Sequence, residues 1–403
     1  MTTKYGRVVL FALFFLLPCS AFSQSRFTGP WDLDSLKRVP QAEWRATEPA
    51  EPGIALKEVY YEGEPYLGRP TRVFAYCAHP KEVDGPLPAM VLVHGGGGTA
   101  FPEWVTRWAK RGYAALAMDT AGHGPGRKRL ADGGPNQSHT EKFAHIADHS
   151  LEDMWTYHAV AAVIRGHSLL ASLEEVDADR IGITGISWGG YLTCIVTGLD
   201  DRLKVSVPVY GCGYLHENSC WLGDFARLTP KQRQTWVDSF DPSRYLPGVT
   251  CPILFVNGTN DFAYPLDSYQ KSYRAVPGRT DLCVTVGMPH GHRPGWAPSE
   301  IGLFVDSVLQ SGVPLPRAGN AEIRGSSITA SIQSNSPLAK ARLHYTVDSG
   351  PWKPRRWTTV DAAIRDATIH AELPKDRPLV CFLTVTDDRG ATVSTEHHVL
   401  SSE

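Results

Sequence analysis

The 403-residue sequence has almost no net charge and no long hydrophobic run. Its 40 basic and 42 acidic residues leave a formal charge of −2 at pH 7. Such a balance gives no general attraction to nucleic acid or to anionic lipid, so neither is expected as a partner. The apolar stretch of residues 8–18 is too short to span a bilayer, which argues against integral membrane association.

Motifs for metals and phosphates are also missing. No cysteine spacing is that of a zinc site, and His145 and His149 enclose Ile146-Ala147-Asp148 without the glutamate of a His-Glu-x-x-His motif. We therefore treat the histidines of this region as loop or helix-surface residues: His139, His145, His149 and His158. The glycine run at 95–98 is not followed by Gly-Lys-Ser/Thr, which disfavours a phosphate-binding loop. We expect neither a metal nor a cofactor.

The N-terminus has the pattern of a secretory signal peptide. Lys4 and Arg7 precede the apolar stretch, and Ala21-Phe22-Ser23 offers a small-x-small cleavage site. We predict cleavage after Ser23 and a secreted or periplasmic protein. A lipoprotein acylated at Cys19 is the alternative, but a proline precedes this cysteine where a small residue is expected.

Cleavage there would leave an odd number of cysteines: Cys77, Cys194, Cys212, Cys220, Cys251, Cys283 and Cys381. At least one of them must then stay free or pair between chains. Cys212 and Cys220 lie close together in one predicted loop and are the best candidates for a disulfide. Cys194 and Cys283 lie in buried patterns, where a cysteine acts as a small hydrophobic residue.

The most informative segment is Gly-Ile-Ser-Trp-Gly-Gly at residues 185–190, which follows an apolar run and precedes a helix-compatible segment. This is the G-x-S-x-G pattern of a nucleophile elbow, in which a strained strand-to-helix turn exposes a serine. An ordinary glycine turn is the alternative, because the chain has 37 glycines. Two further motifs favour the elbow, so we predict Ser187 as the nucleophile.

The first of these motifs is a glycine loop after a predicted strand. Residues 89–93 are apolar and end in His94 and four glycines, the composition of an oxyanion loop in an α/β-hydrolase. Glycines suit this position because a Cβ would block the approach of a carbonyl to the backbone amides. We predict Gly96, Gly97 and the amide of Trp188 as donors, with an uncertainty of one position in the glycines.

The second is an aspartate and a histidine in the chain order that this fold requires. Asp261 follows the apolar strand pattern of residues 252–257, and His290 follows that of residues 282–286. A histidine can accept the serine proton near neutral pH, and an aspartate can fix its tautomer. We predict a triad of Ser187, Asp261 and His290, because His290 is the first histidine after its strand. His292 is expected to line the pocket or to pack locally.

Apolar strand patterns alternate with helical ones from Pro88 to about Ser311, which predicts an α/β fold with a mostly parallel, doubly wound sheet. Residues 58–61 and 71–76 are expected to be its antiparallel entry strands, and residues 150–153 to cap a helix that ends near Leu170. After Pro316 only alternating patterns follow, at residues 326–332, 341–347, 367–373 and 379–385, which predicts a small all-β, sandwich-like unit. The predicted organisation is a signal peptide (1–23), an N-terminal extension (24–57), a catalytic domain (58–313) with a cap-like excursion at about 210–247, and a C-terminal β domain (320–403).

These motifs together resemble bacterial α/β-hydrolases of the acetyl xylan esterase and dienelactone hydrolase group. The resemblance covers residues 59–306 and rests on residues 94–98, 179–182, 185–190, 258–261 and 290–292. The tail, with Trp352, Trp357 and residues 387–390, is similar to the β domain of PhoPQ-activated pathogenicity-related proteins. The resemblance implies the α/β-hydrolase fold and the triad.

The resemblance favours an ester as substrate, and short acyl esters on carbohydrates suit an exported enzyme. Aromatic and histidine side chains near the motifs are candidates for substrate contacts, because flat rings pack on the C–H faces of sugars. They are Phe101, Tyr210, Trp221, Tyr264, His292 and Trp296. Two alternatives stay open. One is a prolyl oligopeptidase-like peptidase, although the chain has no room for a propeller, and the other is a non-catalytic carbohydrate-binding protein.

Overall fold

A computed structural model of the chain describes residues 1–2, 27–48 and 51–401. The predicted signal sequence from residue 3 onward, its cleavage site after Ser23 and Cys19 lie outside the described residues. None of the described helices combines the length and the apolar character needed to cross a membrane.

A nine-stranded sheet forms the larger part of the molecule, with strand order β1-β2-β3-β5-β4-β6-β7-β8-β9. The strands β1, β2 and β3 run antiparallel, as predicted for the entry strands, and the strands from β5 to β9 in this order are parallel. Their bounds are β1 Ala42–Ala46, β2 Ile54–Glu62, β3 Arg72–Pro80, β4 Leu87–Val93, β5 Ala114–Met118, β6 Val176–Ile186, β7 Val205–Val209, β8 Ile253–Gly258 and β9 Thr280–Thr285.

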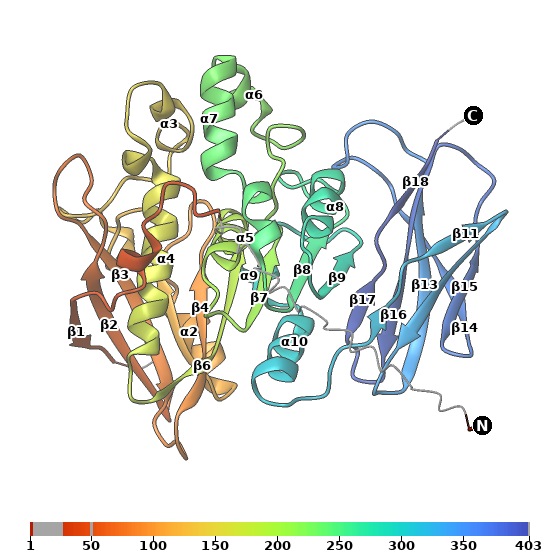
Figure 1. Ribbon diagram of the computed structural model, residues 1–403, viewed down its shortest axis with the longest axis horizontal. Helices are drawn as coiled ribbons and strands as arrows, with labels where there is room; N and C mark the ends of the chain where they lie inside the picture. The colour runs from red at the N-terminus through yellow and green to blue at the C-terminus, as the bar shows by residue number, and fades with distance from the viewer. Residues whose placement is uncertain (3–26, 49–50, 402–403) are drawn as a thin grey trace.

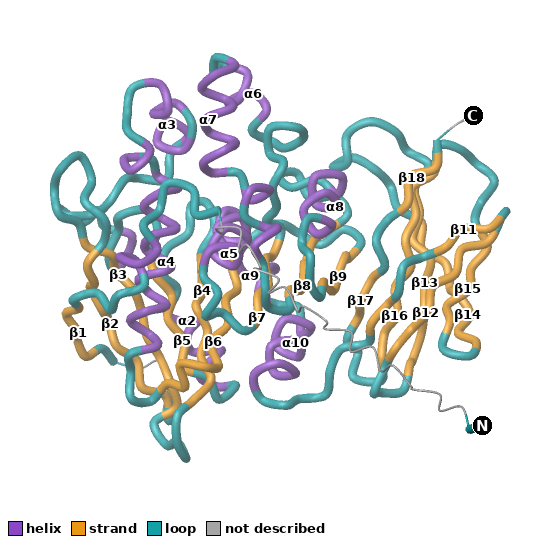
Figure 2. The backbone as a smooth tube through the Cα atoms, viewed as in Figure 1, coloured by secondary structure: helices purple, strands orange, loops and turns teal. Residues whose placement is uncertain are grey.

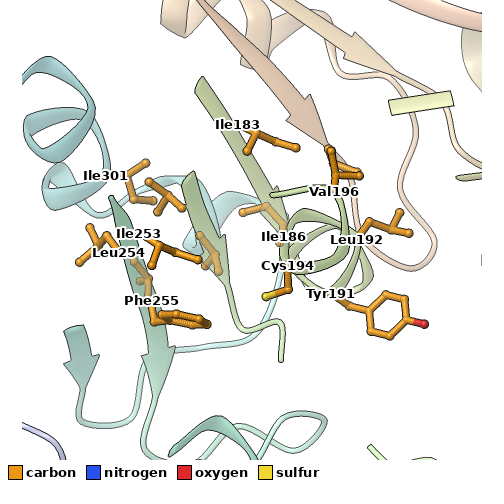
Figure 3. Packing of buried hydrophobic residues seen from close by; sticks show 14 of the residues in the cluster. Ile183, Ile186, Tyr191, Leu192, Cys194, Val196, Ile253, Leu254, Phe255 and Ile301 are labelled. Carbon is orange, nitrogen blue, oxygen red and sulfur yellow. The ribbon is translucent and has the colours of Figure 1, made fainter. Parts of the chain in front are cut away.

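Helices cover both faces of this sheet, which explains why its central strands are apolar throughout (Figures 1 and 2). The helices that flank it are α1 Leu33–Leu36, α2 Pro102–Lys110, α4 Trp155–Ala171, α5 Trp188–Leu199, α8 Leu266–Arg274, α9 His292–Trp296 and α10 Ser299–Leu309. Figure 3 shows α5 beside β6, with Ile186 of β6, Cys194 of α5 and Phe255 of β8 among the buried side chains of the core. This is the α/β-hydrolase fold, and the prediction of it is confirmed.

Three helices form a layer at the top of Figure 1, which we call the cap: α3 His139–Lys142, α6 Leu222–Ala226 and α7 Pro230–Phe240. They come from two segments of the chain that meet through aromatic rings. Phe143 stacks on Trp236 with the ring centroids 5.3 Å apart, and the Trp236 indole N–H donates to the Lys142 carbonyl at 2.7 Å. The predicted excursion at 210–247 therefore supplies only part of this layer, and residues 139–147 supply the rest.

The predicted cap of α4 at Ser150 is wrong. Residues 151–153 form one 3-10 turn, and α4 begins only at Trp155 after an extended Met154. The Ser150 hydroxyl donates to the Asp153 carboxylate at 2.9 Å instead of accepting from the helix backbone. A local side-chain pair thus competes with the capping box that the sequence pattern predicts.

The second sheet is antiparallel and follows α10, which confirms the predicted all-β character of the tail. Its strands are β10 Arg317–Ala318, β11 Glu322–Arg324, β12 Ser327–Gln333, β13 Leu338–Thr346, β14 Thr358–Arg365, β15 Thr368–Glu372, β16 Leu379–Asp387, β17 Thr392–Ser394 and β18 His398–Leu400. We call this unit the C-terminal β domain. It docks with β17 against β9 of the first sheet, where the Val284 amide donates to the Ser394 hydroxyl at 3.1 Å.

The predicted disulfide between Cys212 and Cys220 is not present. Both are free thiols in the structure, and so are Cys77, Cys194, Cys283 and Cys381. Cys212 is completely buried beside Ser272 of α8, whereas Cys220 is exposed on a turn whose amide donates to the Ala263 carbonyl at 3.5 Å. The two side chains thus lie in different surroundings despite their short separation in sequence.

Buried histidines make stability depend on pH. Burial lowers the pKa of His158, His292, His344 and His397 to about 4. A histidine in the unfolded chain titrates near 6.5, so the unfolded state binds more protons between these values. Stability from these groups is therefore complete above about pH 6.5 and is lost as the pH falls toward 4, on the order of several kcal/mol in total.

His344 isolates this effect, because both of its ring nitrogens lie 2.9 Å from threonine hydroxyls, away from the first sheet. We expect the temperature at the midpoint of unfolding to decrease as the pH is lowered from 7 to 5, and to decrease less steeply in His344→Gln. Circular dichroism melts of both proteins at matched ionic strength provide the measurement. Parallel curves for the two proteins would contradict the role of His344.

Candidate active site

Ser187 stands on a strained turn between β6 and α5. Its φ is 60° and its ψ is −118°, a conformation that a residue with a side chain rarely adopts. The two flanking glycines permit the turn, because a Cβ on Gly185 would lie 2.2 Å from the Gly189 carbonyl oxygen. A Cβ on Gly189 would lie 1.9 Å from that of Val93. The sequence therefore folds into an elbow that presents a single hydroxyl above the sheet.

A histidine and an aspartate line up behind this hydroxyl. The His290 Nε2 atom lies 2.9 Å from the Ser187 Oγ atom, and its Nδ1 atom lies 2.6 Å from the Asp261 Oδ2 atom. Asp261 is buried, and its Oδ1 atom accepts the amides of Ala263 and Tyr264 at 2.8 Å each. These bonds fix the carboxylate, which can then hold the imidazole in the tautomer and orientation that accept the serine proton at Nε2.

Two rings hold His290 in place. The Tyr210 ring stacks on its imidazole with centroids 4.5 Å apart, and the Phe262 ring lies 4.8 Å away on a tilted plane. Tyr210 is completely buried, and its hydroxyl donates to the carbonyls of Pro289 and Gly291 at 3.2 and 3.0 Å. Phe262, which we did not predict, leaves half of its surface exposed.

The glycine loop after β4 lies directly beside the elbow. A Cβ on Gly95 would lie 2.8 Å from that of Ser187, and the Gly95 amide already donates to the His292 Nε2 atom at 3.0 Å. In the described part of the chain, the amides of Gly96 and Gly97 have no acceptor. Trp188 begins α5, where a helix offers its amide no acceptor either. Three free backbone donors thus lie close to the serine.

Two neutral histidines support this loop. The His94 Nδ1–H group donates to the Gly95 carbonyl at 2.7 Å, and its Nε2 atom accepts the Thr120 amide at 2.9 Å. Burial lowers the pKa of both His94 and His292, to about 4 for His292, so that each keeps the lone pair that accepts an amide proton. His292 therefore packs beneath the glycines, and its imidazole is not a free wall of the pocket.

The remaining aromatic candidates fall into two groups. Tyr264 is completely buried behind His290, and Trp221 is nearly buried against Trp188 with ring centroids 4.4 Å apart. Phe101 and Trp296 are partly exposed and lie 5.4 Å apart on the other side of the glycine loop, beside His292. Of the predicted aromatic residues, these two offer ring surface to a ligand.

Lys142 of the cap is a charged residue that we did not predict. Only 4 % of its surface is exposed, and its ammonium lies 4.3 Å from the centroid of the Trp188 ring. Burial lowers the pKa of this lysine to about 8. The sequence holds a weak signal for it, since residues 119–150 are a long glycine- and histidine-rich segment, and such loops are uncommon unless functional.

The four histidines between residues 139 and 158 do not converge. His139 pairs with Asp224 of the cap at 2.9 Å, and the rings of His145 and His149 stack 3.9 Å apart. His158 lies edge-on against Tyr66. Over the ranges that the structure describes, no three histidine, cysteine or carboxylate side chains are grouped to hold a metal ion.

Comparison with known families places the chain. The protein-family model described as acetyl xylan esterase (AXE1) matches residues 24–229, which are more than half of the chain. The model described as PhoPQ-activated pathogenicity-related protein matches residues 226–351. Both matches confirm the resemblance inferred from the motifs.

Individual relatives are distant. A putative carboxymethylenebutenolidase from Escherichia coli (strain K12) is 26 % identical over 239 residues, which are 56 % of this chain and 74 % of that protein. The acetyl esterase Axe7A from Xylanibacter ruminicola is 26 % identical over 217 residues, which are 48 % of this chain and 46 % of that protein. The chain thus spans less than half of the second relative.

Two solved structures share the fold. The acetyl xylan esterase from Paenibacillus sp. R4 has a TM-score of 0.58 at 23 % identity, covering 69 % of this chain and 92 % of its own. Acetyl xylan esterase 1 from Thermoanaerobacterium sp. JW/SL YS485 has a TM-score of 0.55 at 20 % identity, covering 70 % and 96 %. Because the acetyl xylan esterase family model matches more than half of the chain, the chain is a hydrolase that belongs to this family.

Proposed function

We propose that the protein is an exported serine esterase that removes short acyl groups, acetyl foremost, from carbohydrates. The observation that carries the proposal is the line of Ser187, His290 and Asp261 on the elbow, with distances of 2.9 and 2.6 Å. Membership of the acetyl xylan esterase family supports the ester as the bond that is cleaved.

The proposed reaction has two halves. Ser187 attacks the ester carbonyl while the His290 Nε2 atom accepts its proton, and the free amides of Gly96, Gly97 and Trp188 stabilise the oxyanion. His290 then protonates the leaving alkoxide of the sugar. Water, deprotonated by the same nitrogen, attacks the acyl-enzyme and releases the acid and the serine.

Two further observations support a carbohydrate substrate and export. The partly exposed rings of Phe101 and Trp296 lie next to the glycine loop and can pack on a sugar or an acyl chain. Lys4, Arg7 and the small residues around Ser23 have the arrangement of a cleavable signal sequence. A protein that acts outside the cytoplasm meets polysaccharide directly.

A hydrolysis panel tests the proposal. The protein of residues 24–403 is assayed with p-nitrophenyl acetate through octanoate, acetylated xylan and an aminoacyl-proline anilide. We expect acetate release from xylan and the highest kcat/KM on the shortest ester. Cleavage of the anilide with weak ester turnover would instead identify a peptidase, and no turnover of any substrate would favour a binding protein.

A further inference from the structure

An exposed aromatic ring lies on one side of the proposed triad. Phe262 follows Asp261 directly, and its ring lies 4.8 Å from that of His290 with half of its surface exposed. In the proposed reaction His290 hands its proton to the leaving alcohol, so the sugar must lie on the histidine side of the serine. The Phe262 ring is therefore placed to contact the sugar, whereas the glycine loop faces the acyl carbonyl.

The C-terminal β domain places a cation over this ring. The exposed Lys353 lies in the turn between β13 and β14, and its ammonium lies 5.7 Å from the centroid of the Phe262 ring. Within the described residues no carboxylate lies within 4 Å of this ammonium. A lysine without an acidic partner at the mouth of a site is free to bind an anion.

A tether holds this turn against the catalytic loop. The Asn260 side-chain amide donates to the carbonyls of Lys353 and Arg355 at 2.9 and 2.7 Å. The Asn260 side-chain oxygen in turn accepts from the Thr259 hydroxyl at 2.6 Å. The residue directly before Asp261 thus fixes the backbone of the lysine in the other domain.

The charge around the turn is positive. Lys353, Arg355 and Arg356 lie within four positions, and only Arg356 has a carboxylate within 4 Å, that of Asp348. The guanidinium of Arg355 lies 3.9 Å from the centroid of the Trp352 ring, and its Nε and Nη1 atoms have no acceptor in the described part of the chain. The three basic residues outnumber the one carboxylate beside them, so the turn has a net positive charge.

We propose that Phe262 and Lys353 form a subsite for an anionic sugar, so that the preferred substrates are acyl esters on glycans that carry carboxylate or sulfate groups. The sugar packs a C–H face on the exposed part of the Phe262 ring, and its anionic group binds the Lys353 ammonium that lies over the same ring. This inference rests on the esterase function proposed above and assigns the C-terminal β domain a role in specificity.

The test measures a ratio of specificity constants. Acetylated xylo-oligosaccharides of equal length are prepared as neutral chains, with one glucuronic acid branch, and with one sulfate ester. For the unmodified enzyme we expect a higher kcat/KM on at least one acidic substrate, through a lower KM. The acidic substrate with the larger preference shows whether the subsite binds a carboxylate or a sulfate group.

Substitutions of Lys353 provide the second measurement. In Lys353→Gln the ratio of acidic to neutral kcat/KM should fall about three- to tenfold, as for a partly exposed ionic contact. Lys353→Arg should restore most of it. Raising the salt concentration should reduce the preference of the unmodified enzyme but not that of Lys353→Gln. Lys340→Gln, at an exposed lysine on β13, is the matched control and should leave the ratio unchanged.

The outcomes separate this inference from the proposed function. Equal kcat/KM on all three oligosaccharides, with no effect of Lys353→Gln, would overturn the subsite while acetate release continues. Absence of acetate release from every ester would overturn the proposed function itself. Phe262→Ala gives an independent check, since it should raise the KM for neutral and acidic oligosaccharides alike, and an unchanged KM would remove the ring from the subsite.

Discussion

Ser187→Ala should lower kcat on p-nitrophenyl acetate by about 10⁴-fold or more while the protein stays folded. The hydroxyl supplies the atom that forms the acyl-enzyme, and no other described hydroxyl shares its contact with His290. Since alanine removes only one oxygen from a turn whose shape the neighbouring glycines permit, the elbow should persist. Initial rates and the midpoint of thermal unfolding, measured on the same preparation, give both quantities.

Ser172→Ala is the matched control, because Ser172 is exposed at the end of α4 and its hydroxyl donates only to the Leu169 carbonyl. This variant should keep full activity. Covalent labelling by a fluorophosphonate should also disappear in Ser187→Ala alone. Retained turnover or labelling without Ser187 would show that the elbow does not supply the nucleophile.

Asp261→Asn should lower kcat by about 10³- to 10⁴-fold with little loss of stability. The asparagine oxygen can still accept the amides of Ala263 and Tyr264, so the loop should keep its form. Its NH₂ group, however, would face the His290 Nδ1 atom and require that atom to be an acceptor. The ring proton then sits on Nε2, so this nitrogen can no longer accept the proton of Ser187.

The measurement is kcat against pH for the unmodified enzyme and Asp261→Asn, with melting curves for both. The same substitution at Asp132, a partly exposed ion-pair partner of Arg72, serves as the control and should leave kcat unchanged. A loss of less than tenfold in Asp261→Asn would argue that another group orients His290. A large loss of stability would instead show that Asp261 acts mainly through the fold.

Most of the α/β-hydrolase domain could be predicted from local sequence patterns. The strands before the glycine loop, the elbow and Asp261 are short apolar runs, and each ends at a residue whose chemistry is visible in the sequence. In the β domain, strand β14 escaped prediction because most of its residues are exposed and show no clean alternation of burial. Such a strand is defined by its partners β13 and β15, which no local pattern reveals.

Long-range packing explains what was missed around the site. His292 was expected to line the pocket or to pack locally, and its ring accepts the amide of a loop nearly 200 positions earlier in the chain. Phe262 and Lys353 come from different domains and meet only after folding. Each missed feature depends on a partner remote in sequence, whereas the spacing of the triad motifs follows from the order of the strands.

Both ends of the first sheet are protected from pairing with another molecule. At one end β1 is short and carries Glu43 and Arg45, charges that discourage a further strand. At the other end β9 lies against β17, and the Ser394 hydroxyl accepts a hydrogen bond from the Val284 amide. A chain cut before residue 317 would leave β9 open, so we expect it to aggregate more readily than the whole protein.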